Sequence, residues 1–224
     1  MVDVAQKQLN MIPSFLGAPV GDLEDLIPGQ VAITGYFCDN LERPMAGQRY
    51  LARQLRYASQ HENMAAKAID LGDVNVFPLE RNKHSSIVTA QCVAVLEIGA
   101  RMVLVGGDAS GLRALGAAAK KVVGMDVPIV SIKGDTTGNF PKTKPIVMSI
   151  DLIELAGVWM SNPRRVTGLS PAEIITQIRA IRGNVIAAAI FGLAPSLDSR
   201  GSTETRAALA ILQAVSERLE KGAI

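Results

Sequence analysis

The chain contains few of the residues that nucleic-acid, membrane or disulfide-rich proteins depend on. Aromatic residues make up only 4% of its 224 positions, and 23 basic residues nearly balance 21 acidic ones. We therefore expect neither a base-stacking platform nor attraction to nucleic acid or to a membrane surface. No apolar run approaches the roughly 18 residues that cross a membrane. The first 15 residues show no secretory pattern.

Cysteine and histidine are also scarce. Cys38 and Cys92 are the only cysteines, which predicts reduced thiols in a cytoplasmic protein. Cys38 is interpreted as a packing residue, because no histidine is placed to activate it. The only two histidines, His61 and His84, lie outside every motif and are predicted to be surface residues.

Hydrophobic residues are plentiful, at 48% of the chain. That share excludes a disordered protein, and the length fits a single domain over residues 1–224 better than two domains. Short apolar runs alternate with helical patterns. Strands are predicted at 31–36, 74–77, 102–105, 128–133, 146–150 and 185–191, and helices at 48–59, 86–99 and 110–122.

Two further helices have clear signals. One opens at Ser170-Pro171, a serine N-cap followed by a proline suited to the first turn. Its apolar face consists of Ile174, Ile175, Ile178 and Ile181. The stripe of the C-terminal helix consists of Ala208, Ile211, Leu212, Val215 and Leu219. The alternation predicts an α/β fold, a three-layer α/β/α arrangement around a mostly parallel, doubly wound sheet.

Ligands of such folds bind outside the carboxyl ends of the strands, so the segments after the strands are the candidate site. Four of them carry a family resemblance: GGDAS at 106–110, KGDTT at 133–137, SIDLI at 149–153 and GLAP at 192–195. They are similar to GGDHS, DAHxD, SxDxD and EVAP of the arginase/agmatinase (ureohydrolase) family. Supporting matches are FLGAP at 15–19, RPMAGQR at 43–49, DLGDV at 70–74 and GLS at 168–170.

The resemblance implies a ureohydrolase-like fold but not the family's chemistry. That family binds two divalent metal ions through one histidine and five further carboxylate or histidine positions. The matching positions here are Ala109, Lys133, Asp135, Thr137, Asp151 and Ile153. Only Asp151 is unchanged, and the family's catalytic glutamate maps onto Gly192. We therefore expect no metal cofactor and no attack by a metal-bridged hydroxide.

The chain is also shorter in its middle than the resemblance implies. Residues 134–145 stand where the family has several dozen residues and two more strands. That length is near the minimum for a parallel crossover. The resulting sheet edge is predicted to be unprotected unless another subunit covers it.

The candidate catalytic residues are Lys133, Asp135 and Asp151. Asp108, Ala109, Ser110, Thr136, Thr137, Asn139 and Gly192 are the candidate pocket residues. Asp108 is also interpreted as a cap on the helix that follows it.

Three interpretations of this group stay open. In the first, Lys133 only neutralises Asp135 and Asp151 in an internal salt bridge. In the second, Lys133 acts on an anion or a carbonyl, as an electrophile, a Schiff-base amine or a base. In the third, one residual metal binds Asp135, Asp151 and Asp108.

The leading functional hypothesis is a metal-independent, degenerate ureohydrolase homologue that acts as a non-catalytic binding or scaffolding subunit. The alternatives are a metal-free enzyme for a small anionic or carbonyl substrate, and an agmatinase-like C–N hydrolase with a single metal. The resemblance implies a homo-oligomer, a trimer or hexamer, with an active paralogue or a pathway protein as a further partner. The sequence does not name the small-molecule ligand.

Overall fold

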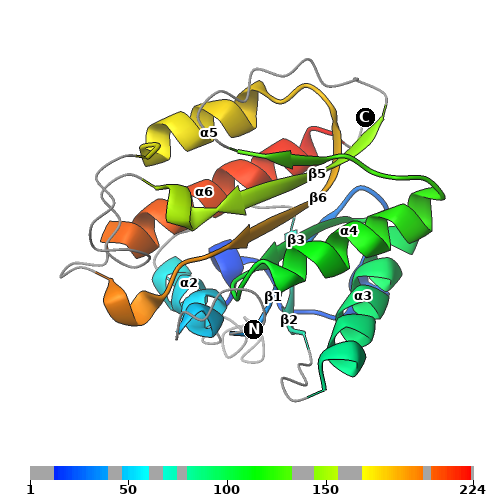
Figure 1. The fold of residues 1–224 in the computed structure, drawn as a ribbon, viewed down its shortest axis with the longest axis horizontal. Helices are drawn as coiled ribbons and strands as arrows, with labels where there is room; N and C mark the ends of the chain where they lie inside the picture. The colour runs from blue at the N-terminus through cyan, green and yellow to red at the C-terminus, as the bar shows by residue number, and fades with distance from the viewer. Residues whose placement is uncertain are drawn as a thin grey trace, which may run out of the picture.

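Six parallel strands form the centre of the computed structural model, in the order β2-β1-β3-β6-β5-β4 (Figure 1). The structure describes residues 13–39, 47–60, 68–74, 80–132, 144–155, 168–198 and 203–222. The strands are β1 (Val31–Gly35), β2 (Ala68–Asp73), β3 (Arg101–Val105), β4 (Ile129–Ser131), β5 (Pro145–Asp151) and β6 (Asn184–Phe191). The central strands are apolar along their length because helices cover both faces of the sheet.

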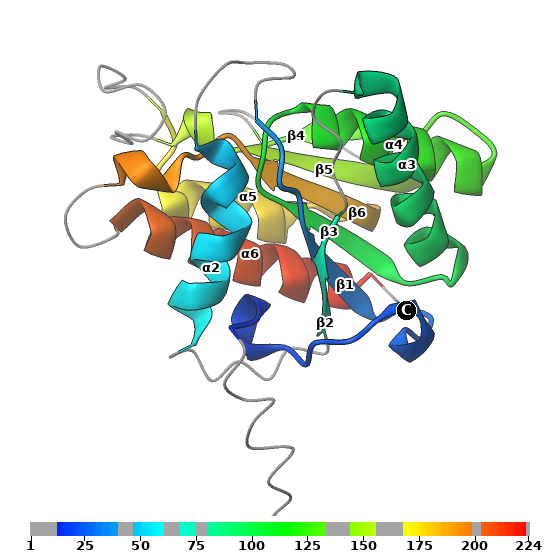
Figure 2. The same ribbon diagram turned by 90° about the horizontal axis from the view of Figure 1, so that it is seen from below.

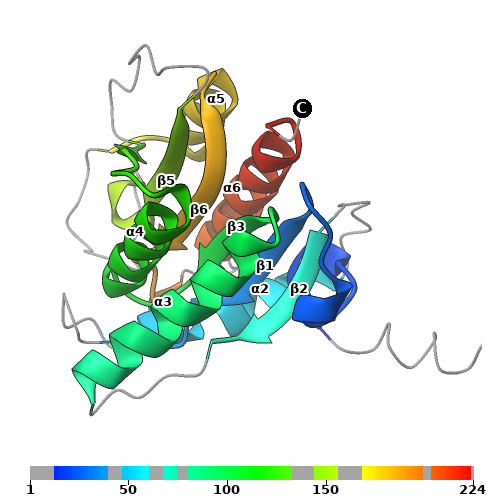
Figure 3. The same ribbon diagram turned by 90° about the vertical axis from the view of Figure 1, so that its right-hand side faces the viewer.

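Helices lie on both sides of the sheet (Figures 1 and 3). One side carries α3 (Arg81–Glu97) and α4 (Ser110–Val123), and the other carries α2 (Leu51–Ser59), α5 (Pro171–Ala180) and α6 (Thr203–Glu220). Each side has its own buried apolar cluster against the sheet. The predicted three-layer, doubly wound α/β fold is confirmed.

The helix signals in the sequence have the predicted structural roles. Ser170 is the N-cap of α5, and its hydroxyl accepts from the Glu173 N–H while the Glu173 carboxylate accepts from the Ser170 N–H. Ile174 and Ile178 of that helix are buried. All five residues of the predicted α6 stripe are buried as well.

Two predicted elements differ from the structure. β2 ends at Asp73 and Val74 lies outside it, while residues 75–77 of the strand predicted at 74–77 lie outside the described residues. The sequence pattern does not indicate β2, because it contains Asp70 and Asp73 and carboxylates are uncommon in strands. In the structure both aspartates form ion pairs with an arginine from α2. Helix α3 begins at Arg81, five residues before the predicted start, over a polar stretch without an apolar stripe.

The short middle segment joins two neighbouring strands at the edge of the sheet. β4 pairs in parallel with β5, and β4 is the last strand in the order. Residues 132–144 are therefore the whole connection between them. The predicted strand at 128–133 ends earlier, at Ser131, and Lys133 lies outside the described residues. None of the helices in the described ranges is long and apolar enough to cross a membrane.

Candidate functional site

The carboxyl ends of β1, β3 and β6 are joined by backbone hydrogen bonds beyond the strands themselves. The Tyr36 N–H donates to the Val105 carbonyl at 2.7 Å, and the Gly106 N–H donates to the Ile190 carbonyl at 2.8 Å. The Gly192 N–H then donates to the Gly107 carbonyl at 3.2 Å. The segments after β3 and β6 are thus direct neighbours, as the predicted site requires.

A chain of side-chain hydrogen bonds begins at Asp108. Its carboxylate accepts from both the N–H and the hydroxyl of Ser110, the former at 3.0 Å. The Ser110 hydroxyl lies 2.6 Å from the Tyr36 phenol, which in turn lies 2.6 Å from His84 Nε2. Four residues, from the end of β1, from α3, from α4 and from the β3–α4 segment, therefore form one continuous polar network.

The proton order in this network follows from the first bond. The Ser110 hydroxyl has one proton and donates it to Asp108, so its oxygen accepts from the Tyr36 phenol. Tyr36 in turn accepts from His84 Nε2–H, which places the proton of neutral His84 on Nε2. Burial raises the pKa of the Tyr36 phenol and lowers the pKa of His84, so both groups are neutral at pH 7.

Tyr36 also explains why glycine is needed in the segment after β3. A Cβ atom at position 107 would lie 2.4 Å from Cδ1 of the Tyr36 ring, and one at Gly111 would lie 2.9 Å from it. Gly107 also has a φ of +66°, where a side chain would be strained. The ring therefore lies directly on the backbone where this segment turns into α4.

Asp151 and Gly192 form a second close contact at the strand ends. The Asp151 side chain accepts from the Ile153 N–H at 3.1 Å and caps the short 3-10 helix η4 (Leu152–Glu154). The same Oδ1 atom would lie 2.3 Å from a Cβ atom at position 192. Gly192 has a φ of +92°. In this arrangement the Asp151 carboxylate fills the space that any side chain at position 192 would need.

The structure places only part of the predicted site. Asp108, Ser110, Asp151 and Gly192 lie at the carboxyl ends of the strands as predicted, and Ala109 is the N-cap of α4. The predicted residues Lys133, Asp135, Thr136, Thr137 and Asn139 lie outside the described residues. Among the residues that are described, no group of three or more histidines, cysteines, aspartates or glutamates could hold a metal ion.

Two interpretations of single residues change. His84 is not on the surface as predicted but buried, with 2% of its area exposed, because the earlier start of α3 carries it onto Tyr36. Asp108 does contact the start of α4, but from the residue before the N-cap. Tyr36 and His84 were both missed as parts of the site. No sequence signal pairs them, since their contact depends on how α3 packs beside β1.

Cys38 follows Tyr36 and is buried. Burial raises its thiol pKa to about 11, so the thiol is protonated at neutral pH. Burial likewise raises the pKa of the Cys92 thiol, to about 12. Neither cysteine is a nucleophile in this environment, in agreement with the packing role predicted for Cys38.

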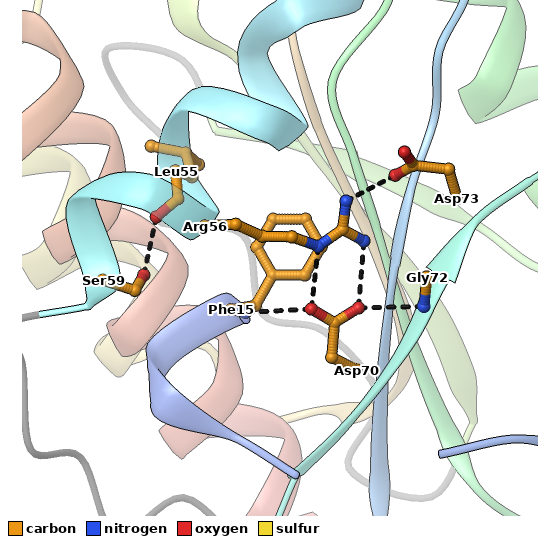
Figure 4. Close-up of polar contacts among 7 residues, drawn as sticks. All are labelled: Phe15, Leu55, Arg56, Ser59, Asp70, Gly72 and Asp73. Atoms are coloured by element: carbon orange, nitrogen blue, oxygen red, sulfur yellow. Dashed lines mark hydrogen bonds and ion pairs between the residues drawn. The ribbon is translucent and has the colours of Figure 1, made fainter. Parts of the chain in front are cut away.

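A separate polar cluster lies at the β2 edge of the sheet (Figure 4). Asp70 is 1% exposed and accepts two hydrogen bonds from the Arg56 guanidinium, at 2.8 and 2.9 Å. The N–H groups of Phe15 and Gly72 supply two more, at 3.0 and 2.9 Å. Arg56 Nη1 donates to Asp73 at 2.6 Å. We call this the Arg56–Asp70 cluster.

Arg56 is held on all sides in this cluster. Its guanidinium carbon lies 4.1 Å from the centre of the Phe15 ring. Burial alone would lower the pKa of Arg56, but the hydrogen bonds and charges of Asp70 and then Asp73 raise it. The FLGAP and DLGDV motifs meet here, so these two matches of the resemblance encode internal structure.

Comparisons with known proteins identify the fold. No family model and no curated protein matches the chain. Among solved structures, a hypothetical agmatinase from Burkholderia thailandensis is similar with a TM-score of 0.80 and 16% identity, over 94% of this chain and 91% of that one. Proclavaminate amidino hydrolase from Streptomyces clavuligerus has a TM-score of 0.75 at 14% identity, over 95% and 98%. Formimidoylglutamase from Bacillus subtilis has a TM-score of 0.75 at 13% identity, over 94% of this chain and 93% of that one. The predicted ureohydrolase-like fold is confirmed.

Proposed function

Because the chain has the ureohydrolase fold, we propose that it is a metal-independent variant of that fold, which does not hydrolyse guanidino substrates and serves as a non-catalytic binding or scaffolding subunit. The contact between Asp151 and Gly192 carries this proposal. The resemblance assigns a catalytic glutamate to position 192. The Cβ atom of a glutamate there would lie 2.3 Å from Oδ1 of Asp151, which is too close for two unbonded atoms. Two carboxylates so close repel each other unless one is protonated or a cation lies between them.

The donor atoms near the strand ends support the same proposal. The side chains of Ala109 and Ile153 carry no atom that ligates a metal, although both stand at positions of family ligands. The Asp151 carboxylate accepts from the Ile153 backbone, and the Asp108 carboxylate accepts from Ser110. These carboxylates have local structural partners, so the described residues do not fit a two-metal centre.

Metal content and hydrolysis test the proposal together. The full chain, purified without chelators, would be analysed by elemental mass spectrometry and assayed for urea release from agmatine, arginine and guanidinobutyrate, with Mn²⁺ or Ni²⁺ added. We expect much less than one metal ion per chain and no urea. About one metal per chain together with urea release would refute the proposal and restore the single-metal hydrolase.

A matched variant distinguishes a bound metal from an adventitious one. Asp151→Asn removes the one family ligand that is unchanged in this sequence, while keeping its size. Any metal that stays after this change is not bound at the strand ends. Metal that is lost with the change, alongside lost activity, would assign it to Asp151.

A second candidate function is favoured by the Asp108–Ser110–Tyr36–His84 network. A half-buried serine with an ordered proton path at the strand ends suits an enzyme with metal-free chemistry on a small anionic or carbonyl substrate. In this alternative Lys133 supplies the amine. Borohydride reduction in the presence of small aldehydes or keto acids would trap an imine at Lys133. A Lys133→Ala variant would lose the adduct and Lys144→Ala, an exposed lysine nearby in sequence, would keep it.

A further inference from the structure

Two arginines meet at the amino ends of the strands, on the far side of the sheet from the candidate site. Arg101 is the first residue of β3, and Arg218 lies in the last turn of α6. Arg101 Nη2 donates to the Gly222 carbonyl at 2.8 Å, and a Cβ atom at position 222 would lie 3.3 Å from Arg218 Nη1. In Figure 2, α6 ends beside the beginning of β3. We call these two residues the Arg101–Arg218 pair.

The pair is held in place by neutral backbone groups. Arg218 is 8% exposed, and its Nε donates to the Ile181 carbonyl at 2.7 Å while its Nη2 donates to the Gly183 carbonyl. Arg101 Nη1 donates to the Val185 carbonyl at 3.3 Å. All four described hydrogen bonds of the pair therefore end on backbone carbonyls. Carbonyl dipoles fix the two guanidinium groups in position but do not neutralise two full positive charges.

The electrostatic environment of the pair differs from that of Arg56. Burial lowers the pKa of Arg101, and burial followed by the charge of Arg101 lowers the pKa of Arg218. Burial would lower the pKa of Arg56 as well, but Asp70 and Asp73 reverse that effect and raise it. The same residue type is thus compensated by carboxylates at the β2 edge, whereas at the amino ends the two charges repel each other. Such a pair is stabilised by a bound counterion.

The pair can accept a ligand from solvent. Arg101 and Gly222 are only half-buried, and Arg182 and Lys221, which are exposed, add positive charge beside the pair in the sequence. The two guanidinium groups have about ten N–H donors, five on each, and the bonds described above occupy four of them. Arg101 Nε is buried and has no acceptor among the described residues. Planar guanidinium groups bind oxyanions through two parallel N–H bonds.

We propose that the Arg101–Arg218 pair binds a phosphate group. A phosphate dianion neutralises both charges and offers acceptor oxygens to both guanidinium groups, whereas a single carboxylate neutralises only one. Free phosphate and the phosphate monoester of a small metabolite share this chemistry. The pair lies at the opposite ends of the strands from Asp108, Asp151 and Gly192, so failure of this proposal would leave the proposed function untouched.

Titration calorimetry with inorganic phosphate and with glycerol phosphate tests the proposal. The full chain would be kept in a phosphate-free buffer of constant ionic strength. We expect saturable binding of about one phosphate per chain and a Tm that rises with ligand concentration. Acetate should bind on the order of 10-fold more weakly, because it has a single charge. Tighter binding of glycerol phosphate would assign the site to monoesters, and tighter binding of inorganic phosphate would assign it to the free ion.

Arg101→Gln is the variant that tests the site itself. This half-buried side chain keeps a similar length but loses its charge, so phosphate affinity should fall about 10-fold or more. Arg218→Lys keeps the charge without the planar group and should also weaken binding. The control is Arg53→Gln, the same change at an exposed position on α2, which should bind phosphate like the wild type.

Circular dichroism would check that each variant is folded. Because Arg218 is buried, a misfolded Arg218→Lys variant would leave the test to Arg101→Gln, which removes the less buried member of the pair. Three results would overturn the proposal. They are a wild type without saturable phosphate binding, acetate bound as tightly as phosphate, and Arg101→Gln bound as tightly as the wild type, which would mean an adventitious ion only.

Discussion

The Arg56–Asp70 cluster and the carboxyl ends of β3 and β5 each hold aspartates, buried at Asp70 and Asp108 and half-buried at Asp151, but their partners among the described residues differ. Asp70 has a cation in bidentate contact and two further backbone donors. Within the described parts of the chain, Asp108 accepts from the Ser110 N–H and hydroxyl, and Asp151 accepts from the Ile153 N–H. The comparison separates a cluster that maintains the fold from the strand ends, where the candidate site lies.

The largest effect is expected from removing Asp70. Asp70→Ala would leave the Arg56 charge buried, with the Phe15 and Gly72 N–H groups lacking their acceptor. We expect the free energy of unfolding to fall by about 3–5 kcal/mol, measured by urea denaturation. Asp73→Ala is the matched control. Its side chain is 43% exposed, so the loss should stay below about 1 kcal/mol. Equal losses in the two variants would contradict a central role for Asp70.

A smaller effect is expected at the strand ends. Gly192→Ala would force a Cβ atom against Asp151 at a φ of +92°, and should cost about 2–3 kcal/mol in the free energy of unfolding. In an Asp151→Ala background the steric contact is gone and only the backbone strain remains. The same glycine change should then cost about 1 kcal/mol less. An unaltered cost in both backgrounds would show that Asp151 does not fill this space.

The smallest effect concerns pH and His84. Burial lowers the pKa of His84 in the folded protein. Below about pH 6.5 the unfolded chain therefore binds a proton that the folded chain does not bind. The free energy of unfolding should therefore fall with decreasing pH, by at most about 1.4 kcal/mol per pH unit from this residue. His84→Gln should have a flatter profile between pH 7.5 and 5.5 in urea denaturation. Parallel profiles would mean that His84 is not held neutral.

The sequence predicted the central strands and the amphipathic helices because their signals are local. Apolar runs such as β6 and the capping box at Ser170 are complete within a few residues. β2 was not predicted, because its aspartates are stabilised in the strand by Arg56, which comes from a different element. His84 was misplaced for the same reason, since its partner Tyr36 lies 48 positions earlier in the chain. Polar residues whose partners are distant in sequence cannot be assigned from local patterns.

The sequence predicts a candidate site at the carboxyl ends of the strands, because these ends form one edge of a parallel sheet whatever the side chains are. Its internal contacts could not be predicted. The fit of Asp151 against Gly192 depends on the register between β5 and β6, where Asp151 lies opposite Phe191. The fit of Tyr36 onto Gly107 likewise depends on pairing between β1 and β3.

The position of β4 has a consequence for how the sheet opens. This strand has three residues, and among the described strands it pairs with β5 alone, at the end of the strand order. Three residue pairs with β5 hold it in the register, so few hydrogen bonds break when it detaches. Amide protons of β4 can therefore exchange with solvent through a local opening, while those of β1, β3 and β6 exchange only when the whole domain unfolds. The sheet has one end that frays and a middle that opens only as a unit.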